Sequence, residues 1–260
     1  MEELFIKNRK MQNLSVIVEK NDIQQGLVLV MHGLGGFKEQ NHIKIIADAF
    51  KEKGYTVVRF DTTNTLGESD GEYEKATVTN YYEDLEDIIS WAKTQEWYQV
   101  PFCLAGHSIG GLCTALYAER YPEQVLALAP ISPVVSGKLS MKAHKLYEPE
   151  ELEMWKTTGW FITKSASKPN VTKKLEWSHM EDRLKYDLLP DVSRLTMPVL
   201  LIVGENDKST PPDQVQILFD ALSGPKELHV IKDAPHTFRD TQHLDEIKRL
   251  LLNWIDKLAK

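Results

Sequence analysis

The stretch LAGHSIGG (residues 104–111) follows an apolar run and precedes an alanine-rich one. Gly106, Ser108 and Gly110 fit the pattern G-x-S-x-G, in which a serine sits on a sharp strand-to-helix turn and its neighbours two residues away must be small. The glycines could instead serve only to let a strand turn tightly into a helix. The position after a buried strand is the context that the motif requires. It predicts that Ser108 stands at the carboxyl end of a sheet, where ligands bind in open α/β folds.

Short apolar runs alternate with helical patterns along most of the chain. Near-continuous Val, Leu and Ile are typical of strands covered on both faces, and a 3.6-residue apolar stripe is typical of the helices between them. The alternation predicts an α/β fold with a doubly wound, mostly parallel sheet, and SVIVEK (15–20) is expected to lead in antiparallel. The expected parallel strands are GLVLVMHG (26–33), YTVVRFD (55–61), VPFCLAGHS (100–108), VLALAPIS (125–132), PVLLIVGEND (198–207) and ELHVIKDAPH (227–236), and the expected helices are 41–54, 80–95, 110–123 and 244–260.

Residues 137–191 break this rhythm. They carry many lysines and glutamates with isolated aromatic residues, and no clear buried strand. A long polar segment between two core strands predicts an inserted helical lid, with residues 1–136 and 192–260 forming the core. The alternative is a set of surface helices whose aromatic side chains only pin them to the core.

The charge balance disfavours several kinds of partner. The chain has 260 residues, a formal net charge of -7 and no block of Lys or Arg, so neither nucleic acid nor an anionic membrane is an expected partner. No apolar run approaches the length of a membrane span, and the N-terminus lacks the apolar core of a signal peptide. Cys103 and Cys113 are expected to be buried thiols rather than metal ligands or a disulfide. We therefore expect a cytoplasmic protein; its oligomeric state is not readable.

A serine hydroxyl needs a base to take its proton, and that base needs a carboxylate to hold its tautomer. Two further strand ends provide them: GENDKSTPP holds Glu205 and Asp207, and DAPHTF presents His236. Asp207 is preferred over Glu205 because it lies further into its loop. The order Ser108, Asp207, His236 is the one expected for this architecture. His107 is a rival base, but its place beside the serine in the turn should point its ring away.

The glycine-rich MHGLGG, after the first buried strand, predicts an oxyanion site. A developing oxyanion needs preorganised donors, and the backbone N–H groups of Leu34 and Ile109 are the candidates. A phosphate-binding loop is the alternative. GLGGFKEQ lacks both G-K-[ST] and the full G-x-G-x-x-G fingerprint, which weakens that interpretation.

Five stretches together resemble the α/β-hydrolase superfamily over nearly the whole chain. They are HGLGG (32–36), FDTTNTLGESDG (60–71), GHSIGG (106–111), GENDKSTPP (204–212) and DAPHTF (233–238). The chain looks most similar to feruloyl or cinnamoyl esterases and to monoacylglycerol-lipase-like serine hydrolases. The resemblance implies the α/β-hydrolase fold, a Ser108–His236–Asp207 triad and an acyl-enzyme intermediate. One loop departs from the family pattern: Asp61 to Ser69 is one residue longer, which puts the local loop shape in question.

The expected activity is hydrolysis of a small-molecule carboxylic ester, with no metal or organic cofactor required. Trp155, Trp160 and Trp177 in the lid would suit an apolar or aromatic acyl group. Amide, peptide or thioester cleavage by the same machinery remains open. So does a binding protein that keeps the fold without catalysis, although such proteins usually lose a member of the triad.

Overall fold

An eight-stranded sheet runs through the molecule in the order β1-β2-β4-β3-β5-β6-β9-β10. The computed structural model describes residues 1–165, 168 and 170–258. From β4 to β10 the neighbouring strands are parallel, whereas β2 pairs antiparallel with both β1 and β4. The strands of this sheet are β1 (Glu2–Lys7), β2 (Asn13–Glu19), β3 (Gly26–Met31), β4 (Tyr55–Phe60), β5 (Phe102–His107), β6 (Val125–Ile131), β9 (Val199–Gly204) and β10 (Lys226–Ile231).

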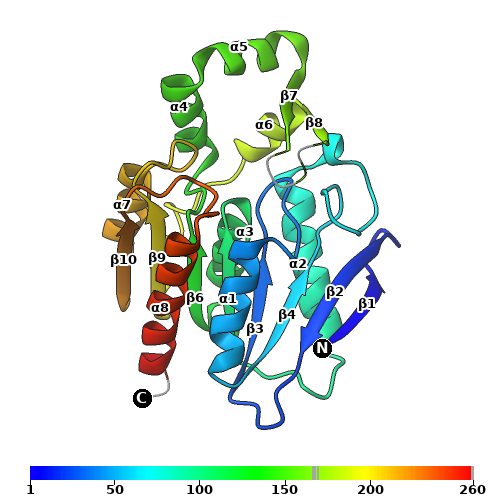
Figure 1. The fold of residues 1–260 in the computed structure, drawn as a ribbon, viewed down its shortest axis with the longest axis vertical. Coiled ribbons are helices and arrows are strands. Elements are labelled where there is room, and N and C mark those ends of the chain that lie inside the picture. Colours follow the sequence, from blue (N-terminus) through cyan, green and yellow to red (C-terminus); the bar gives the residue numbers. More distant parts are fainter. Residues whose placement is uncertain (166–167, 169, 259–260) are drawn as a thin grey trace.

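Helices cover both faces of the sheet, as Figure 1 shows. One buried cluster joins the sheet to α1 and α8, and a second joins it to α2, α3 and α7. All six apolar runs form strands, and the antiparallel lead-in is present as β2, so the predicted doubly wound, mostly parallel sheet is confirmed. The helices of this core are α1 (Asn41–Glu52), α2 (Val78–Ala92), α3 (Ile109–Arg120), α7 (Pro212–Ala221) and α8 (Thr241–Leu258).

Both edges of the sheet depart from the expected pattern. β1 was not expected, because it has only three apolar residues in a row and most of its residues face solvent at the edge. β10 is an edge strand whose residues are mostly half-buried, so coverage on both faces holds only for the central strands. The thiols of Cys103 and Cys113 are free and buried, as predicted.

The segment between β6 and β9 projects from the carboxyl ends of the parallel strands (Figure 1). Its described residues form three α-helices and also an antiparallel hairpin that the sequence pattern did not indicate. The hairpin strands are short and only partly buried, so they lack the apolar run of a core strand. The elements of this insert are α4 (Gly137–Tyr147), α5 (Pro149–Thr158), β7 (Trp160–Lys164), β8 (Thr172–Glu176) and α6 (Ser178–Arg183). Of the helices that the structure describes, none is long and apolar enough to cross a membrane.

Helix α3 approaches the end of β3 so closely that there is no room for a side chain at Gly110. A Cβ atom there would lie 2.4 Å from the carbonyl oxygen of His32 and 2.7 Å from that of Met31. At Gly111 the nearest atoms would lie 3.1 Å away, in the carbonyl oxygen of Gly106 and the ring of Pro133. A side chain at Gly110 would therefore require a backbone shift, whereas a side chain at Gly111 would only be tightly packed.

We predict that Gly110→Ala lowers the free energy of unfolding by about 1–3 kcal/mol, because overpacking outweighs the better helix propensity of alanine. Gly111→Ala is the matched control in the same helix and should cost clearly less. Urea unfolding of the two variants measures the difference. Equal stability of Gly110→Ala and the wild type would contradict the close packing of α3 on β3.

Candidate active site

Ser108 lies on the turn between β5 and α3, with φ 57° and ψ -118°. Three backbone hydrogen bonds hold this left-handed conformation: the Ser108 N–H donates to Ile131 O, and its carbonyl accepts from the N–H groups of Leu112 and Val134. A Cβ at Gly106 would lie 2.4 Å from the carbonyl oxygen of Gly110, so the turn closes on itself without space for a side chain. This is the strained corner that the G-x-S-x-G pattern predicts.

The structure brings Ser108, His236 and Asp207 together from three separate loops. His236 Nε2 lies 3.0 Å from Ser108 Oγ, and His236 Nδ1 lies 2.8 Å from Asp207 Oδ2. Because the carboxylate can only accept, the Nδ1–H donates to it, which leaves the Nε2 lone pair facing the serine hydroxyl. The arrangement can pass a proton from the serine oxygen to the imidazole.

Asp207 is 3% exposed and is held by four hydrogen bonds. Its Oδ1 accepts from the N–H groups of Ser209 and Thr210, and its Oδ2 accepts from the Thr210 hydroxyl at 2.8 Å as well as from His236. Burial alone would raise the pKa of the Asp207 carboxyl, but the charge of His236 and these hydrogen bonds outweigh burial and hold the pKa below its ordinary value. The carboxylate therefore stays ionised beside the imidazole.

The two rival residues have other contacts. Buried His107 donates from Nε2 to the carbonyl oxygen of His236 at 2.9 Å, and burial keeps its pKa well below the ordinary value, so the ring is neutral. Glu205 Oε2 accepts from the Asp233 N–H, which braces the loop that carries His236. Each supports the backbone near the base, and neither side chain bonds to Ser108 Oγ.

Leu34 and Ile109 line one cavity of about 150 Å³ together with Ser108 and His236. Within the described part of the chain, neither the Leu34 N–H nor the Ile109 N–H donates to a protein acceptor. Ile109 is the first residue of α3, so its N–H is one of those that a helix leaves unpaired. Both donors are thus open to a ligand in this cavity.

Two buried residues that sequence reasoning missed hold the loop around Leu34. His32 donates from Nδ1 to Gly33 O at 2.7 Å and accepts at Nε2 from the Thr62 N–H at 3.1 Å, and burial lowers its pKa, so it stays neutral. The Tyr81 hydroxyl accepts from the Gly35 N–H at 3.2 Å. His32 stands directly before the glycine-rich loop, so its sequence position was a visible signal. Tyr81 carried no such signal, because it lies in a helix far along the chain.

The loop from Asp61 to Ser69 is folded around the Asp61 carboxylate. This group accepts from the Lys38 N–H, the Lys38 ammonium and the Glu68 N–H. A Cβ at Gly67 would lie 2.2 Å from Asp61 Cγ, so only glycine fits there. Within this loop, Asn64 has φ 56° and its side chain accepts from the Glu72 N–H. The departure from the family pattern therefore leaves an ordered loop.

The insert contributes polar side chains to the cavity at Ser108: Ser140, His144 and Arg183 line it. None of the three lid tryptophans is among its lining residues within the described chain. Trp155 instead contacts Trp177 and Phe161, with ring centroids 5.4 Å and 5.3 Å away, inside the insert. The lining of this cavity therefore gives no support to the prediction of an aromatic acyl group from the tryptophan content.

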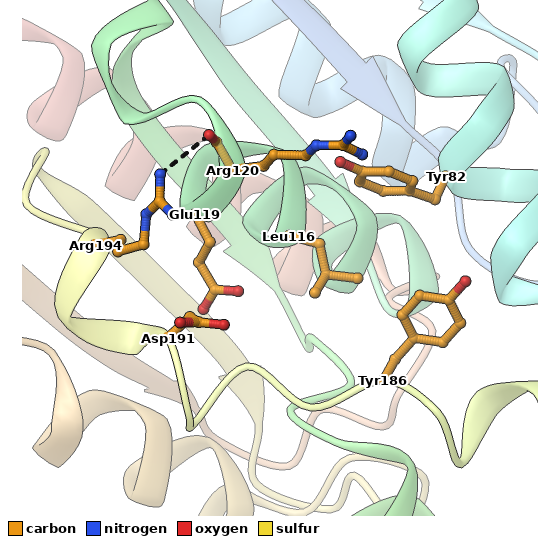
Figure 2. A pocket seen from close by; sticks show the side chains of 7 residues that line it. All are labelled: Tyr82, Leu116, Glu119, Arg120, Tyr186, Asp191 and Arg194. Carbon is orange, nitrogen blue, oxygen red and sulfur yellow. Dashed lines mark hydrogen bonds between the residues drawn. The ribbon is translucent and has the colours of Figure 1, made fainter.

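A larger pocket of about 260 Å³ lies at the opposite end of α3 and is shown in Figure 2. It is lined by residues of α2 and α3, by Tyr186 and Asp191 near the end of the insert, and by Arg194 after it. No member of the Ser108 site belongs to it. Eleven residues separate Glu119 from Ser108 along the chain, which corresponds to roughly 16 Å of helix. This pocket is distinct from the Ser108 site.

The chain is similar to known proteins in both sequence and structure. The family described as serine aminopeptidase, S33, matches residues 22–241. The mitochondrial palmitoyl-protein thioesterase ABHD10 of Mus musculus is 25% identical over 229 residues, covering 86% of this chain and 74% of its own. A thermostable monoacylglycerol lipase from Bacillus sp. (strain H-257) is 24% identical over 217 residues, covering 80% of this chain and 82% of its own.

Among solved structures, Est1E from Butyrivibrio proteoclasticus with bound ferulic acid superposes with a TM-score of 0.81 at 20% identity. The match covers 99% of this chain and 100% of that one. At this identity the likeness speaks for the fold. The predicted α/β-hydrolase fold is confirmed, and so is the resemblance to the group of feruloyl-esterase-like and monoacylglycerol-lipase-like hydrolases.

Glu119, in the pocket of Figure 2, provides a test that is independent of catalysis. Its carboxyl group points toward Asp191, and one of its oxygens is buried without a partner among the described residues. Burial, followed by the charges of Asp191 and Asp187, raises the pKa of Glu119 from 4.5 to about 8. Between these values the folded protein holds a proton that the unfolded chain has lost, so stability falls as pH rises from about 4.5 to about 8.

We predict that Glu119→Gln is more stable than the wild type at pH 8.5 by roughly 2–4 kcal/mol, with a much smaller gain at pH 5. Denaturant unfolding across this range measures the gain. Glu123→Gln, at an exposed position one turn further on, should show no such dependence. A gain from Glu119→Gln that is independent of pH would contradict the raised pKa.

Proposed function

Since the chain belongs to the serine aminopeptidase, S33, family of α/β-hydrolases, we propose that it hydrolyses carboxylic esters of small molecules through Ser108, His236 and Asp207. The observation that carries the proposal is the unbroken chain of hydrogen bonds from Ser108 Oγ through both ring nitrogens of His236 to the buried Asp207 carboxylate. Two of the relatives described above are named a palmitoyl-protein thioesterase and a monoacylglycerol lipase, which fits hydrolysis of an acyl bond.

In the proposed reaction, Ser108 Oγ attacks the acyl carbonyl carbon while His236 Nε2 takes the hydroxyl proton. Asp207 keeps the proton of His236 on Nδ1 and stabilises the imidazolium that forms. The imidazolium then gives its proton to the departing alcohol, which leaves an acyl group on Ser108. A water molecule, activated by the same imidazole, attacks the acyl-enzyme and releases the acid.

The negative charge on the tetrahedral oxygen would be stabilised by the N–H groups of Leu34 and Ile109. Both are unpaired within the described structure and both line the cavity at Ser108. The N-terminus of α3, which begins at Ile109, adds the positive end of a helix dipole. Because these donors are in place before reaction, they cost no reorganisation when the charge develops.

Thioesters and amides are the competing substrate classes. The mouse relative is named a thioesterase and the family an aminopeptidase, and the same nucleophile, base and oxyanion donors would serve all three reactions. Turnover of a p-nitrophenyl ester, a thioester and a p-nitroanilide of one acid separates them. Our proposal requires the ester to be hydrolysed with the highest kcat/KM.

We also propose that residues 137–191 act as a lid on the core formed by 1–136 and 192–260. The contribution of Ser140, His144 and Arg183 to the cavity at Ser108 supports this division. A cytoplasmic location stays a prediction from the sequence, while the mouse relative is mitochondrial by name.

We predict that Ser108→Ala lowers kcat for p-nitrophenyl butyrate by at least about 1000-fold. A fluorophosphonate probe should label the wild type at Ser108 and fail to label the variant, as shown by mass spectrometry of the labelled peptide. Persistence of wild-type turnover in Ser108→Ala would refute the assignment. Tight binding of a small ligand without labelling would instead favour a binding protein.

Thr210 is predicted to position Asp207. Thr210→Val keeps the shape of the side chain but removes the hydroxyl that donates to Asp207 Oδ2, and we expect kcat to fall by roughly 3- to 30-fold. Thr210→Ser restores the hydroxyl and should restore kcat, which a role in packing alone would not explain. Steady-state kinetics and circular dichroism of both variants make the comparison. Equal losses in Thr210→Val and Thr210→Ser would count against the positioning role.

A further inference from the structure

Arg183 places a buried positive charge at the catalytic cavity. It is the last residue of α6, it is 7% exposed, and it lines the cavity together with Ser108 and Ser140. None of the other described lining residues is an aspartate or a glutamate. The residues that line this cavity are Leu34, Ser108, Ile109, Val134, Ser140, His144, Arg183, Ser209, Thr210 and His236.

The partners of the Arg183 guanidinium are neutral. Its Nη1 donates to Ser140 Oγ at 2.7 Å, and its Nη2 donates to His179 Nε2 at 2.6 Å. His179 can accept there because its Nδ1–H donates to Ala76 O, and burial with the neighbouring Arg183 charge lowers its pKa well below the ordinary value. A guanidinium has five N–H groups, and its Nε is buried without a partner among the described residues.

No carboxylate of the described chain forms an ion pair with Arg183. The adjacent Asp182 is used elsewhere, since it accepts from the N–H and hydroxyl of Thr79 and from the Lys185 ammonium. An ionised Tyr73 hydroxyl would stabilise the charged guanidinium. Burial raises the pKa of Tyr73 above its ordinary value, so this hydroxyl is un-ionised at neutral pH.

The guanidinium nevertheless keeps its charge. Burial lowers the pKa of Arg183 to about 10, which still leaves it protonated at neutral pH. A buried charge without a counter-ion is costly, and Arg is suited to a planar, bidentate partner such as a carboxylate. The cavity at Ser108 therefore contains a cation whose complement is missing from the described protein.

We infer that Arg183 binds a carboxylate carried by the substrate, so that the enzyme prefers anionic esters, such as monoesters of dicarboxylic acids, over neutral ones. The inference rests on the proposed function, because it assumes that this cavity receives the substrate of Ser108. An Arg–carboxylate pair with hydrogen bonds to a charged group is expected to favour the anionic ester by about 10- to 100-fold in kcat/KM.

The competing role for Arg183 is structural. Through Ser140 and His179 it connects α4 to α6 and to the carbonyl of Ala76 before α2. A structural arginine would support turnover of charged and neutral substrates equally. The quantity that separates the two roles is the ratio of kcat/KM values for an anionic ester and its neutral counterpart, because loss of folded protein or a general disturbance of the site cancels in the ratio.

The experiment uses matched substrates on the full chain. In the first pair, the mono-p-nitrophenyl ester of glutaric or adipic acid is compared with the same compound capped as its methyl ester, which places the charge on the acyl side. In the second pair, the pentanoyl ester of 4-hydroxybenzoate is compared with that of methyl 4-hydroxybenzoate, which places the charge on the leaving group. A preference for the anion in either pair supports the inference and identifies the half of the substrate that Arg183 faces.

Three variants test the residue itself. Arg183→Met removes the charge and should reduce the anion-to-neutral ratio by about 10- to 100-fold, while Arg183→Lys keeps a point charge without the planar fork and should be intermediate. Arg194→Met is the matched control, since it removes one exposed arginine at the pocket of Figure 2 and should leave the ratio unchanged.

The outcomes separate this inference from the proposed function. If neither member of either pair is hydrolysed in a Ser108-dependent manner, the proposed function fails. If neutral esters are hydrolysed through Ser108 but the wild type shows no preference in either pair, only the assignment of Arg183 fails. If Arg183→Met does not fold, inhibition by free glutarate is measured instead, with a neutral ester as substrate, for the wild type and for Arg183→Lys. Weaker inhibition of the variant supports the inference, and equal inhibition overturns it.

Discussion

The contact between Gly110 and the carbonyl oxygens of Met31 and His32 is the constraint on which the site depends. It brings the start of α3 against the end of β3 at a distance that only a residue without a side chain allows. The first N–H of α3 belongs to Ile109, and the loop that follows β3 carries Leu34, so this one contact sets two backbone donors beside one cavity. A nucleophile on a strained turn is useful only if such donors lie at a fixed distance from it.

The remaining parts of the site are held by buried neutral histidines and tyrosine rather than by charges. His32 ties the loop of Leu34 to Thr62, and His107 holds the backbone of His236. Burial keeps both imidazole rings neutral. Each ring can therefore present one donor nitrogen and one acceptor nitrogen, and neither adds a positive charge near His236. The site thus combines a scaffold of neutral hydrogen-bonding groups with the hydrogen-bonded pair of His236 and Asp207 beside Ser108.

The central strands and the residues of the proposed triad could be predicted from the sequence, because both are marked by local sequence patterns. A buried parallel strand is a continuous apolar run, and the residues at the ends of β5, β9 and β10 must meet at one edge of the sheet. The hairpin of β7 and β8 and the edge strand β1 carried no such run. Tyr81 was taken only as a core residue of its helix, because nothing in the sequence tells that its hydroxyl reaches Gly35.

The insert shows why composition alone misleads about specificity. The tryptophan content predicted substrate contacts. A segment that projects from the sheet must first form a core of its own, and Trp155 packs with Phe161 and Trp177 to form one. What remains facing Ser108 is polar: Ser140, His144 and Arg183. In a chain with a net charge of -7, acidic side chains were available to neutralise a buried arginine, and the fold surrounds Arg183 with neutral acceptors instead. The missing negative charge therefore points to a ligand rather than to packing. The specificity of the site would then depend on Arg183 and not on the aromatic content of the insert.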